Sequence, residues 1–153
     1  MVHDAPSSYI AKVDDNEPAF DYHGALVVVE TDRGEIVLIH PLGGSDYAPA
    51  SLPSDPCSPG EEPALAAVRI VKEKTGLDVD VVREFTSFIQ EGTPTGTMYA
   101  HGFVASVRGG ELLADGPEGA ARSYALDNMP AIMPIRVANQ RTLEEYLRQR
   151  KAE

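Results

Sequence analysis

The sequence predicts a mixed α/β fold in which two helices pack on a small mixed β-sheet as an α/β/α sandwich. Three observations indicate this fold. Residues 24–30 and 35–40 are continuous β-branched apolar runs, which is typical of strands covered on both faces. Residues 63–76 form a run of good helix formers between a proline and a glycine. A second pair of β-rich runs follows, and the chain ends in an amphipathic helical pattern.

The first elements lie in the N-terminal third of the chain. Residues 1–20 mix Ser, Pro, Asp and Asn around an apolar patch at 9–13, so we expect a loose N-terminal arm with one edge strand. We expect residues 21–153 to form a single domain, because 153 residues suffice for one apolar core. The runs at 24–30 and 35–40 flank Thr-Asp-Arg-Gly, which predicts a hairpin.

A loop and a helix come next. The many prolines and glycines between Pro41 and Gly60 exclude a helix and allow only a short edge strand near residues 50–52. A helix is predicted from Pro63 to Thr75, because proline is tolerated in a first turn and the following Gly76 ends the helix. The spacing of its apolar residues predicts a buried stripe of Ala64, Leu65, Ala67, Val68 and Val71.

The second half of the chain predicts a second hairpin and a final helix. The β-rich runs 79–89 and 97–107 are separated by a glycine-containing loop. An acidic loop at 111–119 and a short strand at 122–126 follow. The helix at 139–151 carries on one face Leu143, Tyr146 and Leu147.

Charge and composition narrow the possible partners and location. The formal net charge of −11 repels nucleic acid backbones, so we expect no nucleic acid polymer as a partner. No stretch approaches the roughly 20 apolar residues of a membrane span, and the N-terminus lacks the pattern of a secretory signal. We therefore expect a cytoplasmic protein that has no membrane partner. The single cysteine, Cys57, excludes an internal disulfide and a cysteine cluster for zinc.

The most distinctive segment is residues 52–77, LPSDPCSPGEEPALAAVRIVKEKTGL. It resembles the Nudix box, G-x5-E-x7-R-E-U-x-E-E-x-G-U, in which U is a bulky aliphatic residue. The matching positions are Glu61, Arg69, Val71, Glu73, Gly76 and Leu77. The resemblance implies a MutT-like member of the Nudix hydrolase family with a Nudix-like α/β/α sandwich. It also implies a hydrolase of a nucleoside diphosphate linked to another moiety, a pyrophosphohydrolase.

Three positions depart from this box. Asp55 stands at the opening Gly, Ile70 at the Glu that follows the Arg, and Lys74 at the second of the paired acids. In active family members these helix carboxylates hold Mg or Mn, whereas an alkyl chain or an ammonium supplies no ligand oxygen. The box is therefore degenerate, and we hypothesise that metal binding and hydrolysis are lost or strongly reduced. The expected cofactor is Mg or Mn if the protein is active, and none otherwise.

The resemblance implies roles for the residues that remain. Glu73, Glu61 and Arg69 are the candidate catalytic residues, and Glu73, Glu61 and Glu118 are the candidate metal ligands. Glu118 is matched only by its place in the fold, and a solvated acidic loop is the favoured interpretation of it. Other acids that could lie near the helix are Asp55, Glu62 and Glu91.

Arg69 and Lys74 have two interpretations each. Both could grip a phosphate directly in place of the metal. Alternatively, Lys74 is an exposed lysine placed favourably at the C-terminal end of the helix. Arg69 would then orient the box by pairing with Glu73 at i+4 and with Glu61, as the matching Arg commonly does in this family.

The remaining candidates are weaker. His23, His40 and His101 lie in or at the ends of strands, where a histidine is more often a hydrogen-bonded filler than an acid or base. Cys57 has no predicted basic partner and is expected to be inert. The aromatic side chains that could stack on a base or fill the core are Tyr22, Tyr47, Tyr99 and Phe103.

Three functions stay open at this point. The first is the pyrophosphohydrolase with reduced activity. The second is a non-catalytic Nudix-fold protein that binds a nucleotide or a phosphorylated metabolite. The third is an enzyme repurposed for metal-independent chemistry. All three imply a small-molecule nucleotide or phosphorylated metabolite as partner, and the family resemblance implies a homodimer.

Overall fold

The computed structural model describes residues 19–41, 50–114, 116, 119–131 and 137–152. The predicted edge strand at residues 9–13 lies outside these residues, as do Tyr47 and Glu118.

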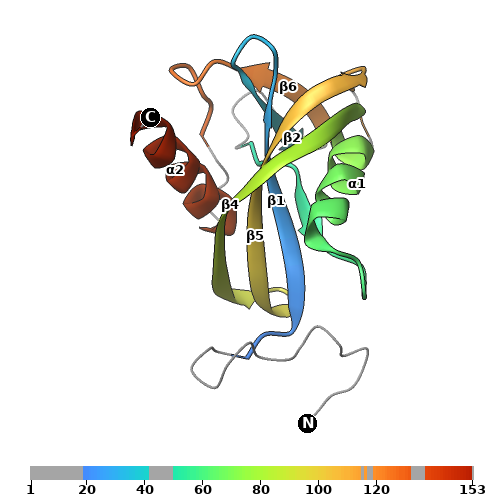
Figure 1. Cartoon of the computed structure of the whole chain (residues 1–153), viewed down its shortest axis with the longest axis vertical. Helices are drawn as coiled ribbons and strands as arrows, with labels where there is room; N and C mark the ends of the chain where they lie inside the picture. The colour runs from blue at the N-terminus through green and yellow to red at the C-terminus, as the bar shows by residue number, and fades with distance from the viewer. Residues whose placement is uncertain (1–18, 42–49, 115, 117–118, 132–136, 153) are drawn as a thin grey trace.

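The described chain forms one mixed sheet with a helix on either side. The sheet order is β4-β5-β1-β2-β6, and β3 pairs with β1. Figure 1 shows α1 and α2 on opposite sides of this sheet. The predicted α/β class is therefore confirmed. The elements in chain order are β1 (Tyr22–Glu30), β2 (Ile36–Pro41), β3 (Ser54–Pro56), α1 (Pro63–Thr75), β4 (Leu77–Thr93), β5 (Gly96–Gly110), β6 (Gly119–Tyr124) and α2 (Val137–Ala152).

The β1 strand lies at the centre of the sheet and is covered on both faces. It pairs in parallel with β5 and antiparallel with β2. Every residue from Gly24 to Val29 is buried, as the continuous apolar run predicts. Val27 and Val29 pack in the cluster that contains α1, whereas Val28 packs with Leu143 of α2. The two core layers therefore follow the alternation of side chains along the strand.

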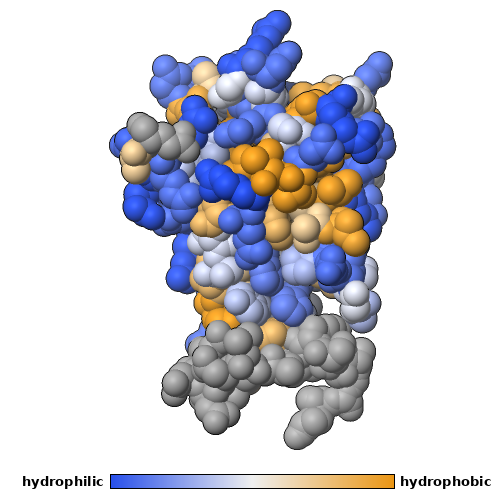
Figure 2. All heavy atoms as spheres, viewed as in Figure 1, coloured by the Kyte–Doolittle hydropathy of each residue, from blue (hydrophilic) through white to orange (hydrophobic). Residues whose placement is uncertain are grey.

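The first helix has the predicted bounds, but its buried stripe differs from the prediction. Gly76 ends α1 in the left-handed conformation, with φ of 83°, and its N–H donates to the Lys72 carbonyl. The side chains buried under the helix are Ala66, Ala67, Ile70, Val71 and Thr75. The prediction for Leu65 was wrong, because this side chain is 62% exposed. It lies four residues before Arg69 and shares its outward face. Figure 2 shows apolar side chains gathered over α1 and β4 among charged ones.

The segment predicted as a loop with a short edge strand contains two pieces of strand pairing. Ser51 forms an isolated bridge with Ile39, inside the predicted stretch 50–52. The sequence did not predict β3, whose residues pair with Gly24 to Leu26. The last strand, β6, begins at Gly119, three residues before the predicted start. These differences arise because β1 and β2 offer backbone groups that a local pattern does not reveal.

The second helix packs as its amphipathic pattern predicts. Leu143 and Tyr146 are buried against the sheet, and Leu147 is partly buried beside them. Asn139 is also buried, and its Oδ1 accepts the N–H of Leu52 at 2.9 Å. This bond ties the first turn of α2 to the start of the box. In the described part of the chain, neither helix is long and apolar enough to cross a membrane.

Candidate functional site

The loop before α1 places Glu61 beside the helix. Gly60 has φ of 78°, a left-handed conformation that favours glycine. The N–H of Ser58 donates to Glu61 Oε1 at 2.9 Å, and the Glu61 N–H donates to the Ser58 carbonyl at 2.9 Å. This small turn fixes the carboxylate of Glu61 next to the side of α1 that carries Arg69.

Arg69 holds the remaining box acids together. Its Nε and Nη2 donate to Glu61 Oε2 and Oε1, both at 2.9 Å, and its Nη1 donates to Glu73 Oε1 at 2.9 Å. Hydrogen bonding to Arg69 lowers the pKa of the Glu61 carboxyl, and the same bond is the main cause of a raised pKa for Arg69. The predicted pairing of Arg69 with Glu61 and Glu73 is confirmed.

The two helix residues that differ from the box, Ile70 and Lys74, supply no ligand oxygen. Ile70 is fully buried in the cluster between α1 and the sheet, so its alkyl chain fills the core. Lys74 is half-buried in the last turn of α1. The neighbouring Lys72 is more exposed and pairs with Asp78 at 3.3 Å. The helix therefore offers one carboxylate, that of Glu73, at its three acidic box positions.

The donor set does not fit the expected Mg or Mn. Both oxygens of Glu61 and one oxygen of Glu73 already accept hydrogen bonds from Arg69. A hard cation needs several free oxygen ligands, and here it would have to displace a guanidinium. Among the residues that the structure describes, no group of three His, Cys, Asp or Glu side chains could hold a metal ion.

The other acids named from the sequence are distributed over two hollows. Asp55 and Glu91 line a cleft, and Glu61 and Glu62 line a smaller cavity. Within the described residues they therefore do not converge on one cation.

The cleft lies between β3, the turn of the β4–β5 hairpin and the first turn of α2. Its volume is about 450 Å³, within the usual range for small-molecule sites. Polar groups and apolar surface both contribute, and no lysine or arginine is among its described lining residues. Tyr22 is the aromatic candidate that lines it. Its walls also include Asp55, Glu91, Met98, Val137 and Asn139.

The smaller cavity lies between β1 and the loop before α1, and its volume is about 220 Å³. Its walls include His23 and Cys57. Burial and the nearby Glu61 carboxylate raise the pKa of the Cys57 thiol to about 11. Cys57 is therefore a neutral thiol at pH 7, which agrees with the expectation that it is inert.

Sequence reasoning missed a chain of three polar side chains on the sheet. His23 Nδ1 lies 2.9 Å from His101 Nε2, and His101 Nδ1 lies 2.9 Å from Glu84 Oε2. The rings of Tyr99 and Phe103 stack against this pair. His23 and His101 are thus hydrogen-bonded, as predicted, but to each other. Glu84 was not predicted, because no sequence signal relates it to two histidines on other strands.

His40, the third predicted filler, lies away from both hollows. Its Nε2 is hydrogen-bonded to the Tyr124 hydroxyl across β2 and β6. His40 is therefore a hydrogen-bonded residue of the sheet, as predicted.

Comparisons with known proteins agree with this arrangement. The model of the NUDIX domain matches residues 22–146. No match is found among curated proteins.

Three solved structures illustrate the likeness. A NUDIX hydrolase from Nitrosomonas europaea has a TM-score of 0.69 at 16% identity, over 86% of this chain and 72% of that chain. A UDP-X diphosphatase has a TM-score of 0.67 at 18% identity, over 88% and 66%. An ADP-ribose pyrophosphatase from Streptococcus suis has a TM-score of 0.57 at 21% identity, over 72% and 78%. At these identities the likeness shows a shared fold.

Proposed function

Because this chain belongs to the Nudix family, we propose that it binds a small nucleoside diphosphate derivative and hydrolyses it with strongly reduced metal-dependent turnover. The observation that carries this proposal is that Arg69 holds both oxygens of Glu61 and one of Glu73 while the cleft beside the box is retained. A shaped pocket supports recognition, and engaged carboxylates oppose metal-assisted chemistry.

The cleft suits the part of the ligand that carries no phosphate. Asp55 and Glu91 are its charged lining residues among those described, so it repels anions. A base or sugar can instead contact Tyr22 and Met98 and donate hydrogen bonds to the two carboxylates. The names of two similar structures, an ADP-ribose pyrophosphatase and a UDP-X diphosphatase, agree with this class of ligand for those proteins.

The diphosphate would lie toward α1. Pro56 of β3 lines the cleft, and its carbonyl lies 3.4 Å from Arg69 Nη2. Arg69 is the box cation near this end, and Lys74 lies in the last turn of the same helix; we propose both as phosphate-binding residues. Glu61 and Glu73 would orient Arg69 through their hydrogen bonds.

Binding is tested without metal by thermal shift with ADP-ribose and a UDP-sugar in EDTA. A ligand of the native state raises the melting temperature. Two exposed valines give a matched pair of variants: Val137, 54% exposed, lines the cleft, whereas Val82, 59% exposed, lies on β4 and is not among its lining residues. Val137→Trp should abolish the shift and Val82→Trp should keep it. Loss of the shift in both variants, or in neither, would contradict the proposed cleft.

The reduced metal dependence is tested by titrating Mg and Mn calorimetrically. Lys74→Glu returns a carboxylate to the second paired position and should increase Mn affinity. Lys72→Glu, with its ion pair to Asp78, is the matched control on the same turn and should not. Tight Mn binding by the unaltered protein that is lost in Glu73→Gln would overturn the proposal.

The same Arg69 contacts favour a second candidate, a non-catalytic protein that binds the same ligands. This second candidate would show a thermal shift with these ligands but form no product from them, with or without metal. The homodimer and the cytoplasmic location remain predictions, of which the first is tested by sedimentation.

A further inference from the structure

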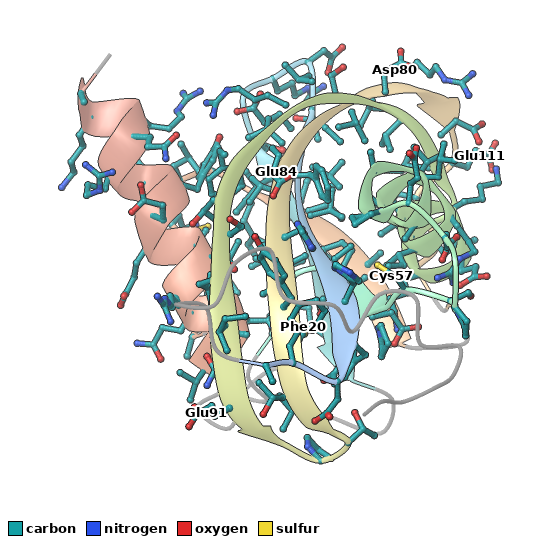
Figure 3. All side chains as sticks on the ribbon, turned by 60° about the horizontal axis from the view of Figure 1, so that its bottom comes forward. Phe20, Cys57, Asp80, Glu84, Glu91 and Glu111 are labelled. Atoms are coloured by element: carbon teal, nitrogen blue, oxygen red, sulfur yellow. The ribbon has the colours of Figure 1, made fainter. Side chains whose placement is uncertain are left out.

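The cleft lies where the β4–β5 hairpin turns, next to the start of α2. In Figure 3 the labelled Glu91, one of its lining residues, lies at this hairpin end of the sheet. The labelled Cys57 belongs to the smaller cavity and lies nearer α1. The two hollows therefore have different walls, and the side chains that can contact a base are those of the cleft.

A methionine covers a glycine on one wall of this cleft. Tyr22, Gly24 and Leu26 share one face of β1, since side chains alternate along a strand. Tyr22 and Leu26 line the cleft, whereas Gly24 is buried and is not among the described lining residues. Met98, which pairs with Tyr22 across β1 and β5, lines the cleft and lies over Gly24. Gly24 therefore affects the cleft through the side chain that covers it.

The missing side chain of Gly24 leaves a recess that Met98 fills. A Cβ at Gly24 would lie 2.3 Å from Met98 Sδ and 3.1 Å from Met98 Cγ. Both distances are shorter than an ordinary contact of roughly 3.5–4 Å. Gly24 is not among the glycines with positive φ, so the backbone itself would accept an alanine. A side chain at residue 24 would therefore have to displace Met98.

The open direction for a displaced Met98 is the cleft. On its inner side Met98 packs against the buried cluster of Leu26, Phe88 and Ala100, which Ala138 of α2 also contacts. A close-packed cluster of this kind takes up an added side chain poorly. Met98 would therefore move outward and reduce the depth of the cleft.

Tyr22, on the same wall, is fixed at its hydroxyl end. Thr93 Oγ1 donates to the Gly96 carbonyl at 2.6 Å, which uses the single hydroxyl proton of Thr93. The Tyr22 hydroxyl must then donate to Thr93 Oγ1, at 2.8 Å. Met98, in contrast, is unbranched and flexible, and its polarisable sulfur makes favourable contacts with aromatic rings. The wall thus combines a fixed aromatic ring with an adaptable thioether.

We propose that Met98 is a specificity-determining residue of this cleft and that Gly24 is the positioning residue that lets its side chain lie against the sheet. The inference rests on the proposed function, which brings the base of a nucleoside diphosphate derivative into the cleft. The base packs against the Met98 thioether, and the recess over Gly24 leaves the depth that a two-ring base needs. A purine buries more surface on this wall than a pyrimidine, so the cleft prefers an adenine derivative to a uracil derivative.

The test measures the Kd of ADP-ribose and of UDP-glucose by calorimetry, with the whole chain and in EDTA. The unaltered protein should bind ADP-ribose more tightly. Gly24→Ala should weaken ADP-ribose binding about 10-fold and UDP-glucose binding less, because the displaced Met98 takes space from the larger base. Gly109→Ala is the matched control: a Cβ at this strand glycine would meet only Asp78 Oδ2, at 3.7 Å. It should leave both affinities unchanged.

A second substitution separates the role of Met98 from that of Gly24. Met98→Ala removes the thioether and should weaken ADP-ribose binding about 5-fold. The double variant Gly24→Ala/Met98→Ala has no thioether to displace, so the added methyl should cost less than about 2-fold beyond Met98→Ala alone. An equal cost of Gly24→Ala with and without Met98 would overturn the inference.

A third measurement uses the unaltered protein. Methionine labelled with ¹³C at its methyl group gives an NMR signal for Met98, which Met98→Ala assigns. Met129 provides the internal control, because it packs in the cluster under α2 and is not among the described lining residues of the cleft. Saturating ADP-ribose should shift the Met98 signal through the ring current of adenine and leave the Met129 signal in place. This measurement decides the inference even if Gly24→Ala does not fold.

The outcomes separate the inference from the function on which it rests. Absence of binding by both ligands to the unaltered protein would overturn the proposed function. Binding with an unmoved Met98 signal, or with unchanged affinities in a folded Gly24→Ala, would overturn the inference alone. Tighter binding of UDP-glucose than of ADP-ribose would overturn the purine preference.

Discussion

The guanidinium of Arg69 holds both carboxylate oxygens of Glu61, with Nε–Oε2 and Nη2–Oε1 distances of 2.9 Å. The contact joins the middle of α1 to the loop that precedes it, and a third N–H extends it to Glu73. It orients the acids that remain in the box and occupies the oxygens that a cation would need. The same geometry thus stabilises the loop and opposes the metal.

Replacing Arg69 by Gln should reduce the free energy of unfolding by about 1 kcal/mol at pH 7, since the pair is only partly buried. Arg69 lowers the pKa of Glu61 in the folded state, so the stabilisation is present above the unfolded pKa and is lost as the pH falls through the folded one. Urea denaturation should therefore show a difference at pH 7 that shrinks as the pH falls below 4.5, the usual pKa of the carboxyl. Arg108→Gln is the control, because Arg108 and Asp80 form an exposed pair at 3.3 Å. An equal loss in both variants would contradict a special role for the Arg69 contact.

Gly76→Ala should destabilise the fold by about 3 kcal/mol. The residue has φ of 83°, and a Cβ there would lie 2.3 Å from the carbonyl oxygen of Glu111, a backbone atom that cannot move aside cheaply. Gly34 separates the two causes, because it has φ of 76° but a Cβ there would meet no heavy atom within 4 Å. Gly34→Ala should cost about 1 kcal/mol from backbone strain alone. Equal losses in chemical denaturation would show that the contact with Glu111 does not matter.

Stability should fall as the pH drops from 7 toward 5, and His23 should account for part of that fall. Burial and the neighbouring His101 lower the pKa of His23 in the folded state, so the unfolded chain binds more protons below the usual value of 6.5. The free energy of unfolding therefore rises with pH through this window and levels off above it. His23→Gln should flatten the profile. A profile as steep in His23→Gln as in the unaltered protein would refute this assignment.

Cys57 should react slowly with iodoacetamide at pH 8. Burial, together with the Glu61 carboxylate, raises the pKa of its thiol from 9.0 to about 11, which makes the reactive thiolate about 100-fold scarcer. Mass spectrometry should show a rate that increases with pH and that reaches the ordinary value in urea. Glu61→Gln should accelerate labelling in the folded protein by removing a nearby negative charge. Slower labelling in that variant would contradict the electrostatic cause.

The sequence predicted a helix or strand well where the residues that define the element lie within it or at its ends. The range of α1 agrees with the prediction from Pro63 and Gly76, because proline and glycine act through the backbone of their own turn. Its buried side was predicted less well: Ile70 and Ala66 face the sheet, and Leu65 does not. Small alanines on two sides of a helix leave its orientation undecided until the sheet is in place. The three residues of β3 were missed for a related reason, since their pairing depends on an open edge of β1.

The residues of the candidate site show the same division: some of their features follow from the sequence, and others depend on the tertiary structure. The order of residues alone determined that the box lacks two of its acids, because Ile70 and Lys74 carry no carboxylate in any conformation. The resemblance to the Nudix box also implied that Arg69 would pair with Glu61 and Glu73, which lie eight and four positions away. Only the tertiary structure decided that His23 meets His101 across 78 residues and that Glu84 completes the chain. That meeting depends on the parallel register of β1 with β5, which is set by the packing of the whole sheet on its two helices and leaves no trace in any short stretch of sequence.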